Sequence, residues 1–71
     1  MKLHYYEDTD TLVIVFSDEP STESTEIAKN VVVDLDARDQ VVAMEIEHAS
    51  TFVGAEELRS GKLQLESIRK P

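Results

Sequence analysis

The sequence predicts a mainly β domain, bordering on the α+β class, built as an antiparallel meander of four strands with a short C-terminal helix and a possible fifth strand. Three observations lead to this prediction. Apolar and polar residues alternate over four short stretches, turn-forming residues separate these stretches, and strong helix formers gather only near residue 55. A period of two places successive side chains on opposite faces of a sheet, which is typical of strands.

The first two strands are expected at residues 2–6 and 11–17, with the polar turn 7–10 between them. One face of this hairpin is apolar along both strands, through Leu3, Tyr5, Leu12, Ile14 and Phe16. The second strand is apolar on its other face as well, because Val13 and Val15 alternate with those residues. A strand that is apolar on both faces is normally covered on both. Such cover is expected from the C-terminal segment or from a second copy of the chain.

Residues 31–50 form the central hairpin of the predicted fold. Its first strand carries Val31, Val33 and Leu35 on one face, and the return strand carries Val42, Met44 and Ile46. The loop 36–40 has aspartates at 36 and 39 but no glycine, which favours a connection of about three to five residues built on a type I turn. Before this hairpin, residues 18–25 contain Pro20 and are rich in Ser, Thr and Glu, so they are expected to form a flexible loop.

The pattern changes after Ser50. Residues 55–60 favour a short helix that stops at Gly61, with Ser50 or Thr51 as its cap. Residues 62–69 are ambiguous: two leucines at a spacing of two indicate a strand, whereas leucine and isoleucine at a spacing of three indicate a helix. A strand is preferred because a glycine at 61 would break a continuous helix.

Length and charge limit the classes of function. Residues 1–71 are expected to form one domain, near the lower size limit for a single apolar core, and a homodimer would supply the missing buried area. The absence of cysteine excludes disulfides and thiolate metal sites, and the formal charge of −8 disfavours nucleic-acid binding while suiting a basic protein partner. No apolar run has the length of a signal peptide or a membrane helix, so a cytoplasmic location without membrane contact is expected.

Three aspartates, Asp34, Asp36 and Asp39, are weak candidates for a metal site, because calcium and magnesium prefer carboxylate oxygens. Their spacing does not fit an EF-hand loop, which needs a glycine at its sixth position and an acid at its twelfth. Acids in a turn and on a solvent-facing strand are the simpler interpretation. No metal and no cofactor are therefore predicted.

The weak catalytic candidates are Asp10, Glu45 and His48. A carboxylate with a raised pKa can act in hydrolysis, but Glu45 alternates with apolar residues in the pattern of a solvent face. His48 lies at a strand end, where a partly buried histidine bonded to the backbone is more frequent than a catalytic one. It lies two residues from Ser50, yet a nucleophile also needs an oriented base. No enzyme is predicted; the alternative is a small metal-dependent hydrolase that uses Asp10, Asp34, Glu45 and His48.

Two motifs in this order resemble a known family. The first is Tyr5 followed by D-T-L-V-I at 10–14; the second is V-D-L-D at 33–36 followed by V-V-A-M-E-I-E-H-A-S at 41–50. Together they resemble the small bacterial and archaeal proteins catalogued as domain of unknown function 2283, over about residues 1–50, leaving 51–71 as a variable segment. Gln40 and Ala43 stand where that family often has glycine, and Tyr6 stands where it usually has a small polar residue.

The resemblance implies a small β-rich domain without an established activity. Such proteins are sometimes encoded beside small toxin-like proteins, which implies an antitoxin-like or regulatory role toward a basic partner. It also implies structural roles for matching residues: Asp10 bonding turn amides, Glu45 as a paired or capping acid, and Ala49 and Ser50 ending the sheet in close packing. The function expected overall is a non-enzymatic protein-interaction or regulatory module that acts as a homodimer.

Overall fold

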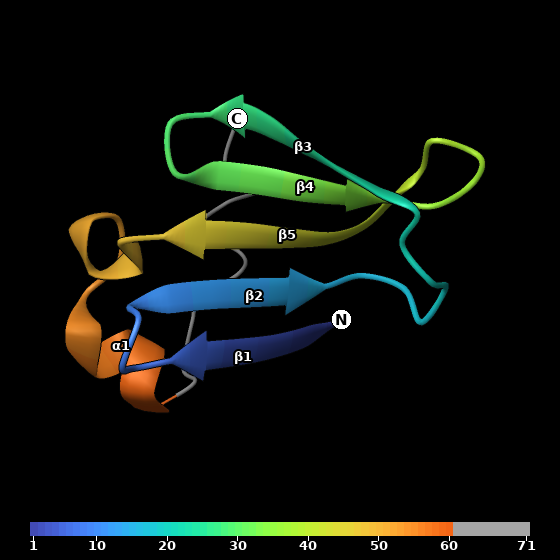
Figure 1. The fold of residues 1–71 in the computed structure, drawn as a ribbon. Helices are drawn as coiled ribbons and strands as arrows, with labels where there is room; N and C mark the ends of the chain where they lie inside the picture. Colours follow the sequence, from blue (N-terminus) through green and yellow to red (C-terminus); the bar gives the residue numbers. More distant parts are fainter. Residues whose placement is uncertain (61–71) are drawn as a thin grey trace, which may run out of the picture.

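The computed structural model describes residues 1–60 and contains one antiparallel sheet of five strands in the order β1-β2-β5-β4-β3 (Figure 1). The mainly β class is therefore confirmed. The elements in chain order are β1 (Lys2–Tyr6), β2 (Thr11–Val15), β3 (Glu23–Ala28), β4 (Val31–Leu35), β5 (Val41–Glu47), the 3-10 helix η1 (Ala49–Thr51) and the helix α1 (Ala55–Ser60). The segment 62–69 lies outside the described residues. No helix within residues 1–60 is long and apolar enough to cross a membrane.

The strand count differs from the prediction because β3 occupies part of the segment expected as a loop. All six residues of β3 are exposed, so this strand has no alternating apolar pattern that sequence inspection can detect. It is held by backbone pairing with β4, in a register that places Ser24 opposite Asp34. From β2 the chain crosses to this far edge, and β3, β4 and β5 then return as a meander that pairs with β2. The single continuous meander is thus interrupted between β2 and β3.

The connection between β4 and β5 spans residues 36–40, as its composition predicted, and it contains a β-turn. The amide of Asp39 donates to the carbonyl of Asp36 at 3.0 Å, and the amide of Asp36 donates to the carbonyl of Gln40 at 2.9 Å. Asp39 has a φ of 62°, in the left-handed region where glycine is otherwise preferred. Aspartate tolerates this region better than most residues, which explains how the turn closes without glycine.

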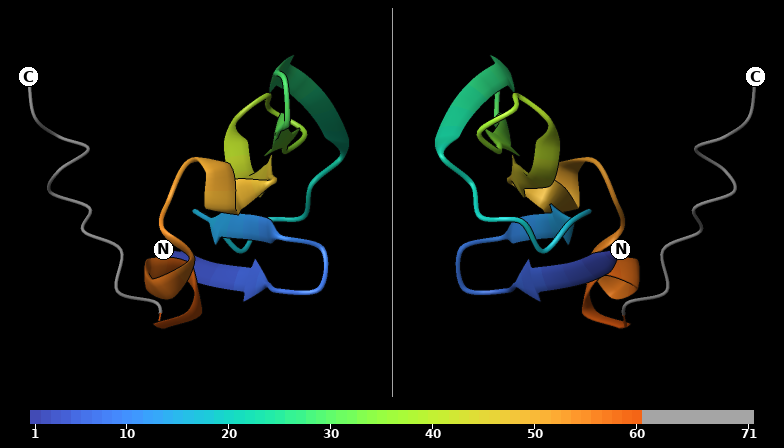
Figure 2. Two further views of the ribbon diagram at one scale, coloured as in Figure 1. Left: turned by 90° about the vertical axis from the view of Figure 1, so that its left-hand side faces the viewer. Right: turned by 90° about the vertical axis from the view of Figure 1, so that its right-hand side faces the viewer.

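One face of the sheet is covered by the chain that follows β5. Leu12, Ala49 and Leu58, from β2, η1 and α1, are 3%, 0% and 4% exposed and form the core cluster. Figure 2 shows α1 on this side of the twisted sheet, beside β1. The partly buried residues packed against the cluster are Leu3, Tyr5, Ile14, Ile46 and Val53. Ser50 and Thr51 lie in η1, so they do not cap α1, which begins at Ala55.

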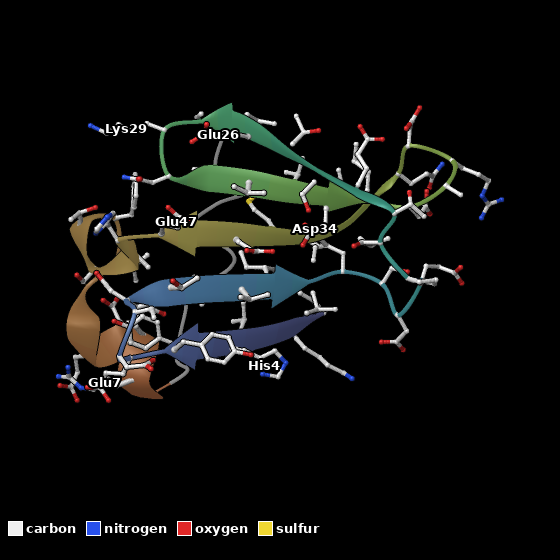
Figure 3. All side chains as sticks on the ribbon, in the orientation of Figure 1. His4, Glu7, Glu26, Lys29, Asp34 and Glu47 are labelled. Atoms are coloured by element: carbon white, nitrogen blue, oxygen red, sulfur yellow. The ribbon has the colours of Figure 1, made fainter. Side chains whose placement is uncertain are left out.

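The other face of the sheet is not covered by any element in residues 1–60. We call it the open face and define it by six side chains on the three inner strands: Val13 and Val15 of β2, Ala43 and Glu45 of β5, and Val32 and Asp34 of β4. All six are half-buried. Figure 3 looks onto this face, on which Asp34, Glu47 and His4 are labelled.

Candidate functional site

The candidate residues lie in three separate places. Asp10 lies in the turn between β1 and β2, next to the chain that leaves β5. Asp36 and Asp39 lie in the turn between β4 and β5. Asp34 and Glu45 lie on the open face. The structure therefore does not bring the proposed hydrolytic set together in one cleft.

Asp10 ties the first hairpin to the end of the sheet. Its Oδ1 accepts a hydrogen bond of 2.5 Å from the hydroxyl of Tyr5, and its Oδ2 accepts one of 2.7 Å from the hydroxyl of Ser50. The amide of Ser50 donates to Oδ1 at 3.1 Å, and the amide of Ala49 donates to the Asp10 carbonyl at 2.9 Å. We call Tyr5, Asp10 and Ser50 the clamp. It joins residues 40 positions apart in the sequence.

The electrostatics of the clamp suit a structural carboxylate. The hydrogen bonds from Tyr5 and Ser50 hold the pKa of Asp10 below its ordinary value of 3.8, with a smaller contribution from the nearby His48. The same bond raises the pKa of the Tyr5 hydroxyl, because the ionised phenolate would lose it. A carboxylate with a low pKa and occupied acceptor sites is a poor general base. The clamp thus fits the role in bonding turn amides that the family resemblance implied.

His48 is placed by the backbone at the start of η1 rather than beside a nucleophile. It has a φ of 54° and a ψ of 44°, and its carbonyl accepts a hydrogen bond of 2.7 Å from the Thr51 hydroxyl. Its side chain is exposed. The Ser50 hydroxyl donates to Asp10, so it is not oriented toward the imidazole. The described geometry does not assemble a Ser–His pair.

Asp36 closes the turn after β4. It is 9% exposed, and its Oδ1 accepts hydrogen bonds from the amides of Arg38 and Gln40 at 2.8 and 3.0 Å. These two backbone donors hold the pKa of Asp36 below its ordinary value. Within residues 1–60, no group of three or more histidines and acids is arranged to hold a metal ion.

Glu45 and Asp34 form a carboxyl pair on the open face. Glu45 lies in the central strand β5, opposite Val13 of β2 on one side and Val32 of β4 on the other. Asp34 lies one residue pair along, opposite Ala43, and accepts a hydrogen bond of 2.5 Å from the Ser24 hydroxyl. The hydrogen bond between the two carboxyls raises the pKa of Glu45, and partial burial and the charges of Asp34 and Glu47 add to the effect.

The ion pairs that the structure records do not include Asp34 or Glu45, although Lys2 lies on the same side of the sheet as these two, opposite Val15. Lys2 lies 4.0 Å from Asp18, and Arg59 lies 3.8 Å from Glu7 and 3.6 Å from Glu56. Among the described residues, no cation forms an ion pair with a carboxylate of the open face. Residues 1–60 hold fourteen of the fifteen acidic side chains but only four of the seven lysines and arginines. The open face is thus apolar along its valines and carries negative charge that the described chain does not neutralise.

Sequence inspection did not predict that Tyr5 bonds to Asp10 or that Ser24 bonds to Asp34. The order of Tyr5, Asp10 and Ser50 is part of the family-like motifs, so that order was the available signal for the clamp. Ser24 had no such signal, because its contact with Asp34 depends on β3, an exposed strand without apolar alternation.

Comparison with known proteins identifies a family for this chain. The sequence profile of a family described as "Protein of unknown function (DUF2283)" matches residues 2–50. This range contains all five strands, the clamp and the open face, and it ends before α1. No curated protein and no solved structure matches the chain.

Proposed function

This chain belongs to the DUF2283 family of proteins of unknown function, and we propose that it is a non-enzymatic protein-interaction module that binds a basic partner protein. The observation that carries the proposal is the open face. Its side chains combine apolar surface from Val13, Val15 and Val32 with the carboxylates of Asp34 and Glu45. An apolar patch bordered by unneutralised charge of one sign is typical of a surface that meets a partner of opposite charge.

The face contrasts with an ordinary solvent-exposed sheet surface. An antiparallel sheet with one face in water usually carries polar residues on that face. Here the position on either side of Glu45 across the sheet is a valine. Burying such side chains under a partner is favourable by about 25 cal/mol per Å² of apolar area. A basic partner would supply both this cover and the missing positive charge.

The non-enzymatic part of the proposal is supported by the separation of the candidate residues. Hydrolysis by a set of acids and a histidine requires the groups to surround one reacting atom. Asp10 is committed to the clamp, and His48 lies at the start of η1. Asp34 and Glu45 lie together on the open face, and the histidine on that side of the sheet, His4, is separated from Glu45 by Val13.

In-cell photo-crosslinking tests the proposal. A photoreactive phenylalanine analogue placed at Val13 would project from the open face, and the same analogue at Glu56 would project from the exposed part of α1. We expect a crosslinked protein of positive net charge from position 13 only, and a Kd in the micromolar range or below when that protein is purified and titrated calorimetrically with the full chain. Crosslinks that are equal at both positions, or a purified protein that does not bind, would contradict the proposal.

A homodimer is the second candidate, and the open face is a poor place for it. Two copies packed face to face would bring the carboxyl pairs Asp34 and Glu45 near one another, which like-charge repulsion opposes. A different observation favours self-association: Phe16 and Val41 are 47% and 44% exposed, and they lie at the same end of the β2–β5 pair, where Phe16 donates its amide to the Val42 carbonyl.

Sedimentation equilibrium at micromolar concentration tests the dimer. We expect the wild-type chain to sediment at twice its mass of 8.0 kDa and Phe16→Ser to sediment as a monomer. A wild-type monomer would contradict the dimer without affecting the proposed basic partner.

A further inference from the structure

We propose that an arginine side chain of the partner enters the open face between Val13 and Val32 and pairs with the carboxylates of Glu45 and Asp34. This inference rests on the proposed function and adds to it the position and the chemistry of the main contact. The occupant of the site is a segment of the partner in which apolar residues alternate with arginine.

The position follows from the register of the three inner strands. Glu45 projects from the central strand, and its direct neighbours across the sheet are Val13 and Val32. Neighbouring strands lie about 4.8 Å apart, so the two valines stand roughly 10 Å from each other with the carboxylate between them. Asp34 is the diagonal neighbour of Glu45, and the bond from Ser24 fixes its orientation. Glu45 thus projects between two valines, and Asp34 lies diagonally beside it, between Ala43 and Ser24.

Arginine fits this arrangement better than other side chains. A guanidinium presents several donors in one plane and can bond two carboxylates at once, whereas an ammonium is a single point of charge. Its long apolar stem can pack along the two valines while the charged end reaches the carboxylates. Apolar neighbours reduce the access of water, which strengthens the ion pair relative to one on an open surface.

The partner's charge would replace a proton. The neighbouring Asp34 and partial burial raise the pKa of Glu45, so in the free protein this carboxyl stays protonated to a higher pH than an ordinary glutamate does. The other titratable groups on this side of the sheet are Glu47 on β5, Glu26 on β3, and Lys2, His4 and Tyr6 on β1. At a pH where Glu45 is protonated, binding of the guanidinium displaces the Glu45 proton to the buffer. Binding is therefore expected to weaken as the pH falls through the raised pKa of Glu45.

The partner segment is expected to be extended and alternating. Side chains two residues apart in an extended segment point the same way and lie about 6.8 Å apart. Such a segment can place an arginine over Glu45 and apolar residues over the neighbouring valines. A segment that carried only charged residues would leave the valines of the open face exposed to water.

A titration of the isotope-labelled full chain tests the inference. The probe is the peptide Val-Arg-Val-Arg-Val with blocked ends, and the matched probe carries citrulline, which has the shape of arginine without its charge. We expect the arginine peptide to shift the amide resonances of β2, β4 and β5 in a saturable manner at pH 7.5, and the citrulline peptide to bind at least tenfold more weakly. Calorimetry in two buffers of different ionisation enthalpy should show proton release at acidic pH that declines to zero as the pH rises above the raised pKa of Glu45.

Variants locate the contact. Glu45→Gln should weaken the arginine peptide roughly five- to tenfold, and Asp34→Asn by a similar factor. Glu19→Gln, which removes the same charge from the exposed loop after β2, should change the Kd by less than twofold. An equal loss in Glu45→Gln and Glu19→Gln would show attraction by overall charge alone and overturn the inference. Shifts confined to the amides of the edge strand β3 would overturn it in favour of strand addition.

These outcomes are separate from those of the crosslinking test. A partner crosslinked from Val13 whose affinity is insensitive to Glu45→Gln leaves the proposed function standing and rejects the arginine contact. Resonance shifts on the open face that depend on the concentration of the chain alone would indicate a second copy as occupant and reject it as well. The absence of any binding by the arginine peptide also rejects it.

Discussion

The two faces of the sheet use neighbouring residues of the same strands for different purposes. In β2, Leu12 points to the covered face and is almost fully buried under η1 and α1, whereas Val13 points to the open face and remains half-exposed. On the covered side the structure ends in the clamp, where both carboxylate oxygens of Asp10 accept hydrogen bonds. On the open side the carboxylates of Asp34 and Glu45 form no ion pair with a cation of the described residues. The covered face therefore stabilises the fold, and the open face is available for a partner.

The comparison also separates two kinds of carboxylate. Hydrogen-bond donors hold the pKa of Asp10 low, so its charge stabilises the folded state. A neighbouring carboxyl and partial burial raise the pKa of Glu45, so its charge destabilises the folded state until a cation arrives. A residue that costs stability when charged is consistent with a role in binding rather than in folding.

The largest effect on the free energy of unfolding is expected from a comparison of alanine substitutions on the two faces of β2. Leu12→Ala should lower the free energy of unfolding by about 3 kcal/mol, because it opens a cavity in the core cluster. Val13→Ala should lower it by about 1 kcal/mol, since that side chain already contacts water. Urea unfolding followed by circular dichroism measures both. Equal losses would show that the open face is packed as tightly as the core and would remove the distinction.

The clamp is expected to give the next largest effect, and it depends on pH. Asp10→Asn keeps the shape of the side chain but removes the charge that Tyr5 and Ser50 stabilise, so it should lower the Tm at pH 7. Because the folded-state pKa of Asp10 is depressed, its contribution is present above the ordinary value of 3.8 and is lost as the pH falls through the folded-state value. The difference in Tm should therefore narrow as the pH falls below 3.8.

Asp8→Asn is the matched control for the clamp, because Asp8 is exposed in the same turn. Its Tm should follow that of the wild type at each pH. A penalty for Asp10→Asn that persists unchanged at low pH would show that the charge of Asp10 is not what the clamp uses.

On the open face, removal of a carboxylate charge is expected to raise the Tm rather than lower it. The raised pKa of Glu45 means that the ionised carboxylate costs stability, a cost that is present above the raised pKa and relieved as the pH falls through it. Glu45→Gln should therefore raise the Tm slightly at pH 7.5 and leave it unchanged near pH 4. Differential scanning calorimetry at the two pH values measures this. A Tm lowered as much as by Asp10→Asn would place Glu45 among the residues that hold the fold.

The smallest effect is expected from the ion pairs beside the covered face. Arg59 lies on α1 and pairs with Glu7 and Glu56, but both pairs are largely exposed. Arg59→Ala should change the free energy of unfolding by less than about 0.5 kcal/mol. Leu58→Ala, one residue earlier in the core cluster, should cost about 3 kcal/mol. Urea unfolding measures both free energies. If the two variants lost similar amounts, apolar packing would not be the main interaction that holds α1 on the sheet.

The strands in which apolar and polar residues alternate could be predicted from the sequence. Period-two patterns located β1, β2, β4 and β5, and helix propensity located α1. β3 shows no alternation of buried and exposed residues, because all six of its side chains are exposed and backbone pairing holds the strand. Part of it was therefore expected to be a loop. The connection from β2 to the far edge of the sheet was missed for the same reason.

The candidate site shows the same division. The low-pKa carboxylates occupy positions that turn chemistry and the family-like motifs had marked, namely Asp10 and Asp36. Glu45 was correctly placed on a face without a core contact, but its pairing with Asp34 was not predictable. That pairing depends on the register between β4 and β5, which shifts by a bulge after Asp34. A register fixed by a bulge is not visible in a residue pattern.

The central claim is that the covered face holds the fold and the open face binds. The most direct test measures the Tm and the Kd for the Val-Arg-Val-Arg-Val peptide on the same samples of Asp10→Asn and Glu45→Gln, with the Kd determined at a temperature where both variants are folded. Asp10→Asn is predicted to lower the Tm with an unchanged Kd, and Glu45→Gln to weaken the peptide at least fivefold without lowering the Tm. Variants in which both quantities change together would contradict the claim.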